Sequence, residues 1–292
     1  MAPNCGEPLH GVDGPMDGET FASSHDATRA QAVRASEEIT ALGSVVLRQV
    51  WPTGPLAELR SAIATFCDKR RIDVEEGRFA HATAKMYASH GVGTVSGLIH
   101  DGLMKPVQMV RLFEGSLYAD ICRAYFGSDR LYCQLSRCGF REHRTSISRK
   151  SFIPYHQDSY SQDEQITDVL NCWIPLDPCG VSAPGLEVVR NPCHPDFPRK
   201  DFGLASENAA YDFITIDRGE VIKAFGDCFL APSFDVGDCL IFSQNVIHRT
   251  YVTGAMDQPR INFELRIFAE HCMRPEARDL MIRDGNVTRL SH

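Results

Sequence analysis

The sequence at residues 260–267 is Arg260-Ile261-Asn262-Phe263-Glu264-Leu265-Arg266-Ile267, in which polar and apolar side chains alternate strictly. Successive side chains of a β-strand point to opposite faces of a sheet, so the pattern predicts a strand with one polar and one apolar face. The apolar face suits packing against a layer of helices, and the polar face suits the wall of a wet cavity. A strand at the solvent surface would show a similar alternation, so other features must decide between the two interpretations.

Further short strands are predicted from Leu131 onward, where apolar runs are separated by Pro, Gly and Asp. One of them, at 169–176, places Asn171 and Trp173 on one face and apolar residues on the other. Trp173 either borders a pocket or packs in the core as a large aromatic side chain. The predicted strands are 131–141, 151–157, 168–176, 186–190, 238–243, 246–252 and 260–268.

Helices are predicted ahead of these strands, which favours a mainly β protein whose antiparallel sheet is flanked by helices. Residues 1–25 are rich in Gly, Pro, Asp and Ser without periodicity, and we expect a flexible leader there. Residues 26–292 are expected to form a single domain with a sheet core from about 131 to 268. The predicted helices are 26–41, one that begins at Thr53, and 106–126, with a short strand at 44–48.

The composition argues against several classes of partner. The formal net charge is −8, and no basic run is longer than residues 69–71, which speaks against a nucleic acid or an anionic membrane as the main partner. No apolar run is long enough to span a membrane, and residues 1–25 lack the pattern of a secretory signal. The 11 cysteines include no CxxC pair, and Cys172 and Cys239 lie in apolar runs. We therefore expect reduced, buried thiols and a cytoplasmic protein.

A set of metal ligands is predicted from the segment His156-Gln157-Asp158 and from His248. Residues two apart in a strand share a face, so His156 and Asp158 can converge on one ion. His248 follows an apolar strand, and the turn at Gly237-Asp238 would bring the chain back across the sheet. Two imidazoles and one carboxylate can hold one face of an octahedral Fe(II) and leave three positions open. Either histidine alone would as readily be an ordinary surface or core residue.

Arg260 is the additional feature that favours a cavity over an exposed strand. It follows His248 by 12 residues, and a hairpin of that length returns the arginine to the neighbourhood of the predicted metal. A guanidinium is permanently charged and binds carboxylates with two parallel hydrogen bonds. Arg260 could therefore anchor a dicarboxylate such as 2-oxoglutarate beside the metal ion.

These motifs occur in an order that resembles a known enzyme family. The resemblance covers about residues 37–268 and is carried by 37–48, 155–158, 173–177, 184–189, 237–242, His248 and Pro259-Arg260. Together they resemble the phytanoyl-CoA dioxygenase-like family of Fe(II)- and 2-oxoglutarate-dependent oxygenases. The resemblance implies a double-stranded β-helix core, also called a jelly-roll or cupin-like core, with helices packed on its larger sheet. It implies His156, Asp158 and His248 as the iron ligands and catalytic centre.

The resemblance also implies a co-substrate site and the use of O2. Arg260 would form the salt bridge to the distal carboxylate of 2-oxoglutarate, and Trp173 matches a position that borders this co-substrate. From strand parity we predict Arg266 as a second cation near the same site. Family members often use another basic residue on the strand before the HxD motif. Arg137 and Arg141 both qualify, and the sequence does not choose between them.

The expected reaction is hydroxylation of an unactivated C–H bond in a small molecule, with release of succinate and CO2. Halogenating relatives replace the carboxylate ligand with a small residue, whereas this chain retains Asp158, which favours hydroxylation. Relatives often have Pro-Gly-Ser-His where residues 190–194 are Arg-Asn-Pro-Cys-His, so the substrate does not carry over. A secondary metabolite is the preferred hypothesis. Residues 74–105 and 192–236 are predicted to be lid and substrate loops or, equally, ordinary surface connections. No oligomeric state is indicated.

Three alternative functions remain open at this stage. A cupin-like isomerase or hydrolase could use the same ligands without 2-oxoglutarate, and changing Arg260 would then leave activity intact. A non-catalytic relative could serve as a binding module, and it would fail to bind Fe(II) or 2-oxoglutarate. A zinc hydrolase could use a three-ligand site, and it would work without O2.

Overall fold

In the computed structural model, the alternating segment forms one strand, β10 (Arg260–Ala269), inside a large antiparallel sheet. The strand pairs with β5 (Leu170–Pro175) along one edge and with β3 (Leu131–Gln134) and β4 (Gly139–His143) along the other. Its apolar side chains belong to the main hydrophobic core. Residues 21–76, 91–144, 152–158, 165–191, 216–226, 228–283 and 287–290 are described by the structure.

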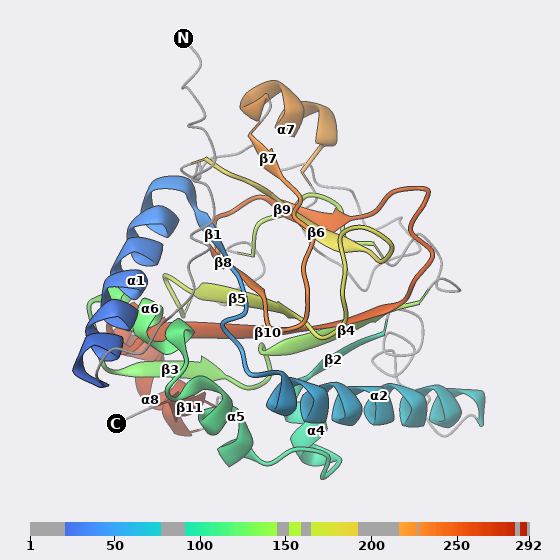
Figure 1. The fold of residues 1–292 in the computed structure, drawn as a ribbon. Helices are drawn as coiled ribbons and strands as arrows, with labels where there is room; N and C mark the ends of the chain where they lie inside the picture. The colour runs from blue at the N-terminus through green and yellow to red at the C-terminus, as the bar shows by residue number, and fades with distance from the viewer. Residues whose placement is uncertain are drawn as a thin grey trace.

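The strands form two antiparallel sheets that lie one above the other in Figure 1. The large sheet has the order β1-β8-β5-β10-β3-β11, and β4 pairs with both β10 and β2. The small sheet has the order β7-β6-β9. The remaining strands are β1 (Ser44–Leu47), β2 (Val92–Thr94), β6 (Gly185–Val189), β7 (Phe229–Leu230), β8 (Cys239–Ser243), β9 (His248–Tyr251) and β11 (Val287–Leu290).

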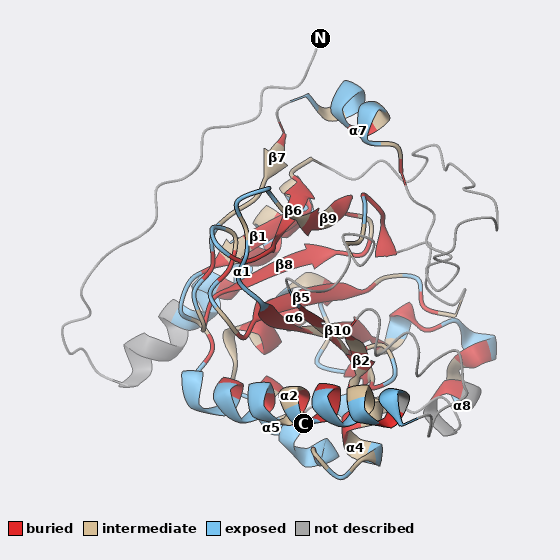
Figure 2. Ribbon diagram, turned by 90° about the vertical axis from the view of Figure 1, so that its right-hand side faces the viewer, coloured by how far each residue is buried: buried red, intermediate tan, exposed pale blue. Residues whose placement is uncertain are grey.

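Helices cover the side of the large sheet that faces away from the small sheet (Figure 1). Helix α2 (Thr53–Glu75) begins at the predicted residue and buries Leu56, Leu59, Ile63 and Phe66, the face that its spacing predicts. Figure 2 shows this helix with its buried side turned toward the sheet and its exposed side outward. The other helices are α1 (Phe21–Leu42), α4 (Val95–His100), α5 (Pro106–Phe113), α6 (Leu117–Phe126), α7 (Arg218–Phe225), the 3-10 turn η3 (Glu270–Cys272) and α8 (Pro275–Arg283).

Several predicted boundaries are wrong. The predicted helix 106–126 is divided into α5 and α6, because Gly115 adopts a left-handed φ of 72° and Ser116 caps a new helix. The predicted strand 131–141 is two strands, since the backbone turns at 134–138. Within 152–158, the described part of the predicted strand 151–157, the only pairing is an isolated bridge from His156 to His248.

Other elements were not predicted from the sequence, or they begin at a different residue than the predicted one. Residues 74–105, predicted to be a loop, contain β2 and α4 in their described part. Helix α1 begins at Phe21 rather than at Asp26, and residues 1–20 of the predicted leader lie outside the described residues. The mainly β architecture with flanking helices is confirmed.

The cysteines largely follow the prediction of buried thiols. The free cysteines among the described residues are all buried, at 67, 122, 133, 138, 172, 179, 239 and 272. Cys228 differs, because it is disulfide-bonded, and the prediction of a fully reduced chain is wrong for it. None of the described helices is both long enough and apolar enough to cross a membrane.

Candidate metal centre

The two predicted histidine ligands lie side by side because their backbones pair. His248 is the first residue of β9, and His156 lies in the extended segment 152–158. Each backbone N–H donates to the carbonyl of the other residue at 3.0 Å. The two imidazole centroids are 4.1 Å apart. This bridge between distant segments therefore places the two rings side by side.

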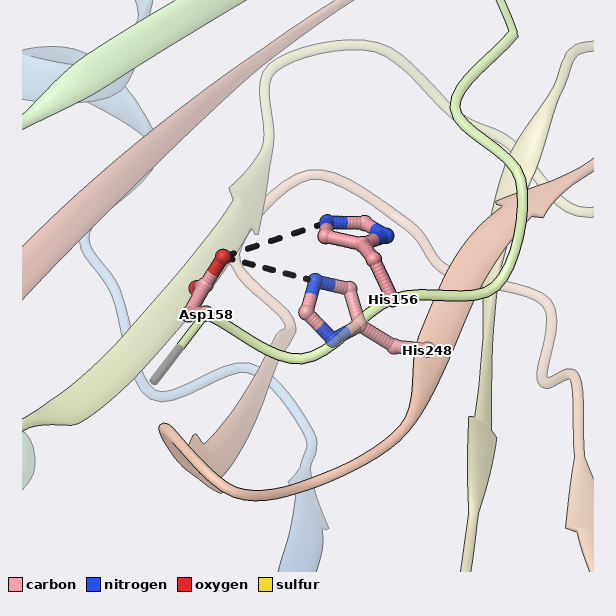
Figure 3. Close-up of side chains that lie close together, drawn as sticks. All are labelled: His156, Asp158 and His248. Atoms are coloured by element: carbon pink, nitrogen blue, oxygen red, sulfur yellow. Dashed lines mark ion pairs between the residues drawn. The ribbon is translucent and has the colours of Figure 1, made fainter. Parts of the chain in front are cut away.

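Asp158 completes a compact triad with these histidines (Figure 3). Its Oδ1 lies 3.9 Å from His156 Nε2 and 4.0 Å from His248 Nε2, distances too long for hydrogen bonds. Two donors that are each roughly 2.1 Å from one ion can be at most about 4.2 Å apart, and about 3 Å apart on one octahedral face, so a small inward movement would bring these atoms onto a shared metal. The three residues are at most 5% exposed. Within the described residues, this is the only group of three potential ligands found.

The tautomer of each histidine is set by the protein backbone. His156 Nδ1 lies 2.8 Å from the carbonyl oxygen of Pro154, and His248 Nδ1 lies 2.9 Å from that of Val246. A carbonyl oxygen only accepts, so each Nδ1 must carry the proton. In the neutral form of each ring, Nε2 then presents its lone pair toward Asp158, which is the state that binds a metal ion.

The charges around the triad favour the same protonation state. Burial, together with the neighbouring His248, lowers the pKa of His156 to about 3, so its imidazole is neutral at neutral pH. Burial alone would raise the pKa of Asp158, but the Arg266 guanidinium acts together with the two neighbouring histidines and Arg137 to lower it below the usual value. The neutral imidazole of His156 therefore faces the same point as the His248 imidazole and the Asp158 carboxylate. This donor set fits Fe(II).

Arg260 is a buried cation without an acidic partner among the described residues. It is 2% exposed, and its guanidinium donates to Asn262 Oδ1 at 2.5 Å and to the carbonyl oxygen of Gly185 at 3.3 Å. Its Nε has no hydrogen-bond partner. Burial lowers the pKa of Arg260 to about 10, so it still carries its charge at neutral pH. A buried charge of this kind is costly unless an anion joins it, and a dicarboxylate would fit here.

Arg266 stands six residues further along the same face of β10, but its surroundings differ. Its Nη2 lies 3.3 Å from Asp158 Oδ2 and 3.2 Å from Glu264 Oε2. Its Nη1 donates to the carbonyl oxygen of Arg137 at 3.2 Å. Asp158 therefore offers Oδ1 to the histidines while Oδ2 is held by Arg266. The contact of Arg266 with a co-substrate stays a prediction.

One cavity of about 360 Å³ brings the predicted residues together. The polar residues of β10 all line it, which supports the cavity interpretation of the alternating segment over the exposed one. Arg137 and Arg141 both line it as well, so the structure does not choose between them either. The guanidinium of Arg260 lies 4.9 Å from the ring centroid of Trp173. All six predicted site residues line the cavity: His156, Asp158, Trp173, His248, Arg260 and Arg266.

Strand β2 forms a wall of the cavity that sequence reasoning missed. Val92, Gly93 and Thr94 line the cavity, and β2 pairs with β4. A Cβ on Gly93 would lie 2.1 Å from the Phe140 ring, so only glycine allows this close packing. The sequence predicts a loop over residues 74–105, whereas Gly93 lies in a strand that closely approaches an aromatic side chain.

Comparisons with known proteins support the fold. No protein-family model matches the sequence, and neither does any curated protein. EvdO2 from Micromonospora carbonacea var. aurantiaca, complexed with 2-oxoglutarate, gives a TM-score of 0.56 at 16% identity, covering 81% of this chain and 90% of that chain. SnoK, a non-heme alpha ketoglutarate dependent carbocyclase from nogalamycin biosynthesis, gives 0.55 at 14% identity, covering 88% and 91%.

A third solved structure is EctD from S. alaskensis with 2-oxoglutarate and 5-hydroxyectoine. It gives a TM-score of 0.54 at 16% identity and covers 82% of this chain and 77% of that chain. At such identities the likeness concerns the fold, and it confirms the predicted jelly-roll architecture. The function must be argued from the site itself.

Proposed function

We propose that the protein is a non-haem iron dioxygenase that uses 2-oxoglutarate and O2 to hydroxylate an unactivated C–H bond of a small molecule, releasing succinate and CO2. The observation that carries the proposal is the combination of a buried His-Asp-His triad with Arg260 in one cavity. A metal-only enzyme would need the triad, but it would have no use for a buried cation that lacks an acidic partner. A 2-oxoglutarate enzyme needs both.

Each residue has a separate task in this proposal. His156, Asp158 and His248 would hold Fe(II) and act as the catalytic centre, with Nε2 of each imidazole as the donor. Arg260 would bind the distal carboxylate of 2-oxoglutarate, and Trp173 would form the wall beneath it. Arg266 would hold Asp158 in place and supply a second cation near the co-substrate. When bound, iron and co-substrate supply the oxidising chemistry, while the cavity keeps bulk water away.

We further place the protein with the phytanoyl-CoA dioxygenase-like enzymes and expect a cytoplasmic location, with residues 26–292 as one catalytic domain. The substrate class we favour is a secondary metabolite. SnoK, which shares the fold, is from nogalamycin biosynthesis, and EctD was crystallised with 5-hydroxyectoine, both small-molecule settings. Hydroxylation is favoured because the carboxylate ligand Asp158 is present. Since SnoK is a carbocyclase, product analysis should also look for a ring-closed product.

The proposal is tested by anaerobic titration of the apoprotein with Fe(II) and then with 2-oxoglutarate. We expect a weak visible charge-transfer band that needs both components and is absent from the Arg260→Gln variant. Arg70→Gln is the matched control, because Arg70 is a largely buried arginine that pairs with Asp101 outside the cavity. If calorimetry shows no binding of 2-oxoglutarate to the metal-loaded protein, the proposal fails. Activity with zinc in the absence of O2 would point to a hydrolase instead.

A further inference from the structure

A buried polar cluster lies on the face of the small sheet that points away from the metal. Side chains alternate along a strand, so the residues next to His156 and His248 point to the opposite side from the ligands. These neighbours are Tyr155 and Arg249, and both contact the same carboxylate, that of Glu187 in β6. Tyr155 is 3% exposed and Glu187 is 7% exposed.

The contacts in this cluster join all three side chains. The hydroxyl of Tyr155 donates to Glu187 Oε1. Arg249 donates from Nε to Glu187 Oε1 at 2.6 Å and from Nη2 to Oε2 at 3.1 Å, which is a two-point contact. The guanidinium also lies over the Tyr155 ring, 4.8 Å from its centroid. Removal of the carboxylate would leave a phenol and a guanidinium without their shared acceptor.

The sheet register places this cluster next to the two predicted histidine ligands. Glu187 lies opposite Arg249 in the β6–β9 pair, and the next residue, Val188, lies opposite His248. His156 is held to His248 by the pair of backbone hydrogen bonds, and the same segment is joined to β9 again where the Thr250 N–H donates to the Ile153 carbonyl oxygen at 3.0 Å. A side-chain attachment one residue away from each histidine would further limit sliding and rotation of these two segments.

We propose that Glu187 is a positioning residue that fixes the spacing of His156 and His248 from behind the sheet, through Tyr155 and Arg249. The inference rests on the proposed metal site but not on the use of 2-oxoglutarate. Partners that orient metal ligands typically change metal affinity by roughly 10- to 100-fold when they are removed. Glu187 does not touch the ligands directly, so the effect is expected near the lower limit, about tenfold.

A merely structural role would produce a different result. Asp101 provides the comparison, because its buried carboxylate accepts two hydrogen bonds from Arg70 Nη2, at 2.8 and 2.7 Å, between α2 and the end of α4. Loss of either carboxylate should lower the free energy of unfolding, since each removes a two-hydrogen-bond contact of a largely buried arginine. Only the loss of Glu187 should change the affinity for the metal.

The experiment measures Mn(II) binding to the full-length apoprotein by electron paramagnetic resonance, with Mn(II) as a redox-stable probe. Glu187→Ala should weaken binding about tenfold, Glu187→Gln should recover part of it by retaining one acceptor oxygen, and Asp101→Asn should bind as the wild type does. Wild-type affinity in a folded Glu187→Ala variant would overturn the inference. If that variant does not fold, Tyr155→Phe replaces it: weaker Mn(II) binding supports the inference, and unchanged binding overturns it.

Addition of 2-oxoglutarate after the Mn(II) titration separates this inference from the proposed function. A wild-type protein that binds Mn(II) but not 2-oxoglutarate would contradict the dioxygenase proposal and leave the role of Glu187 intact. A wild-type protein that does not bind Mn(II) at all would overturn both.

Discussion

At Arg260 we expect a conflict between binding of the co-substrate and stability of the apoprotein. Its charge is buried and has no acidic partner among the described residues, so the apoprotein carries an electrostatic cost at this position. Arg260→Gln should therefore keep or raise the free energy of unfolding of the apoprotein, measured by urea titration. The same variant should weaken 2-oxoglutarate binding on the order of a hundredfold, because a buried charge pair is lost. A destabilised variant with normal 2-oxoglutarate affinity would contradict this assignment.

Arg266 should show the reverse pattern, although it lies on the same face of the same strand. Its ion pair with Asp158 Oδ2 holds the carboxylate that completes the triad. We expect Arg266→Leu to weaken Fe(II) binding by roughly 10- to 100-fold, measured anaerobically by calorimetry, because the ligand loses its orienting partner. Arg260→Gln should leave Fe(II) affinity unchanged. If both variants alter the same affinity, the division of labour between the two arginines is wrong.

The sequence could predict those site residues that are recognisable from short motifs and from the spacing between them. The triad and Arg260 depend on strand parity and on the spacing between short motifs, and the structure brings them into one cavity. The partner of Arg266 could not be predicted, because Asp158 lies 108 residues away in the chain. Glu187 was missed for a related reason: its importance depends on the register between β6 and β9, which no local pattern reveals.

At the level of elements, the turn before β8 depends on one glycine. Gly237 has φ of 104°, and an added Cβ would lie 3.1 Å from the carbonyl oxygen of Trp51. Gly237→Ala should lower the free energy of unfolding by about 1–3 kcal/mol, since an L side chain is strained in this conformation. Gly54→Ala in α2 is the control: it meets nothing within 4 Å and should raise the free energy by roughly 0.5 kcal/mol. Equal effects in urea unfolding would argue against backbone strain at Gly237.

The predicted elements were most accurate where the hydrophobic pattern was long and regular. The strict alternation at 260–267 and the apolar stripe from Leu56 to Phe66 both correspond to observed elements. The boundary at Gly115 was missed because one left-handed residue ends a helix without interrupting the apolar pattern around it. The segment 152–158 has strand-like composition but pairs only at His156, since its pairing depends on the distant β9.

For the whole molecule, the buried histidines predict a dependence of apoprotein stability on pH. Burial lowers the pKa of His156 to about 3, and it also lowers the pKa of His143 well below its usual value of 6.5. The unfolded chain therefore binds more protons than the folded protein as the pH falls below about 6.5. The free energy of unfolding should be greatest above that pH and should decline steadily toward pH 3.

This dependence can be measured by urea unfolding of the metal-free protein at a series of pH values from 8 to 5. The slope should be shallower in His156→Leu, because that variant lacks one of the groups that titrate differently in the two states. Proton competition with the metal for His156 should begin only near pH 3, below this range, because its imidazole is already neutral in the folded protein. Stability that is flat or rises between pH 7 and 5 would mean that these imidazoles are protonated in the folded protein. The assignment of a neutral, metal-binding imidazole to His156 would then be wrong.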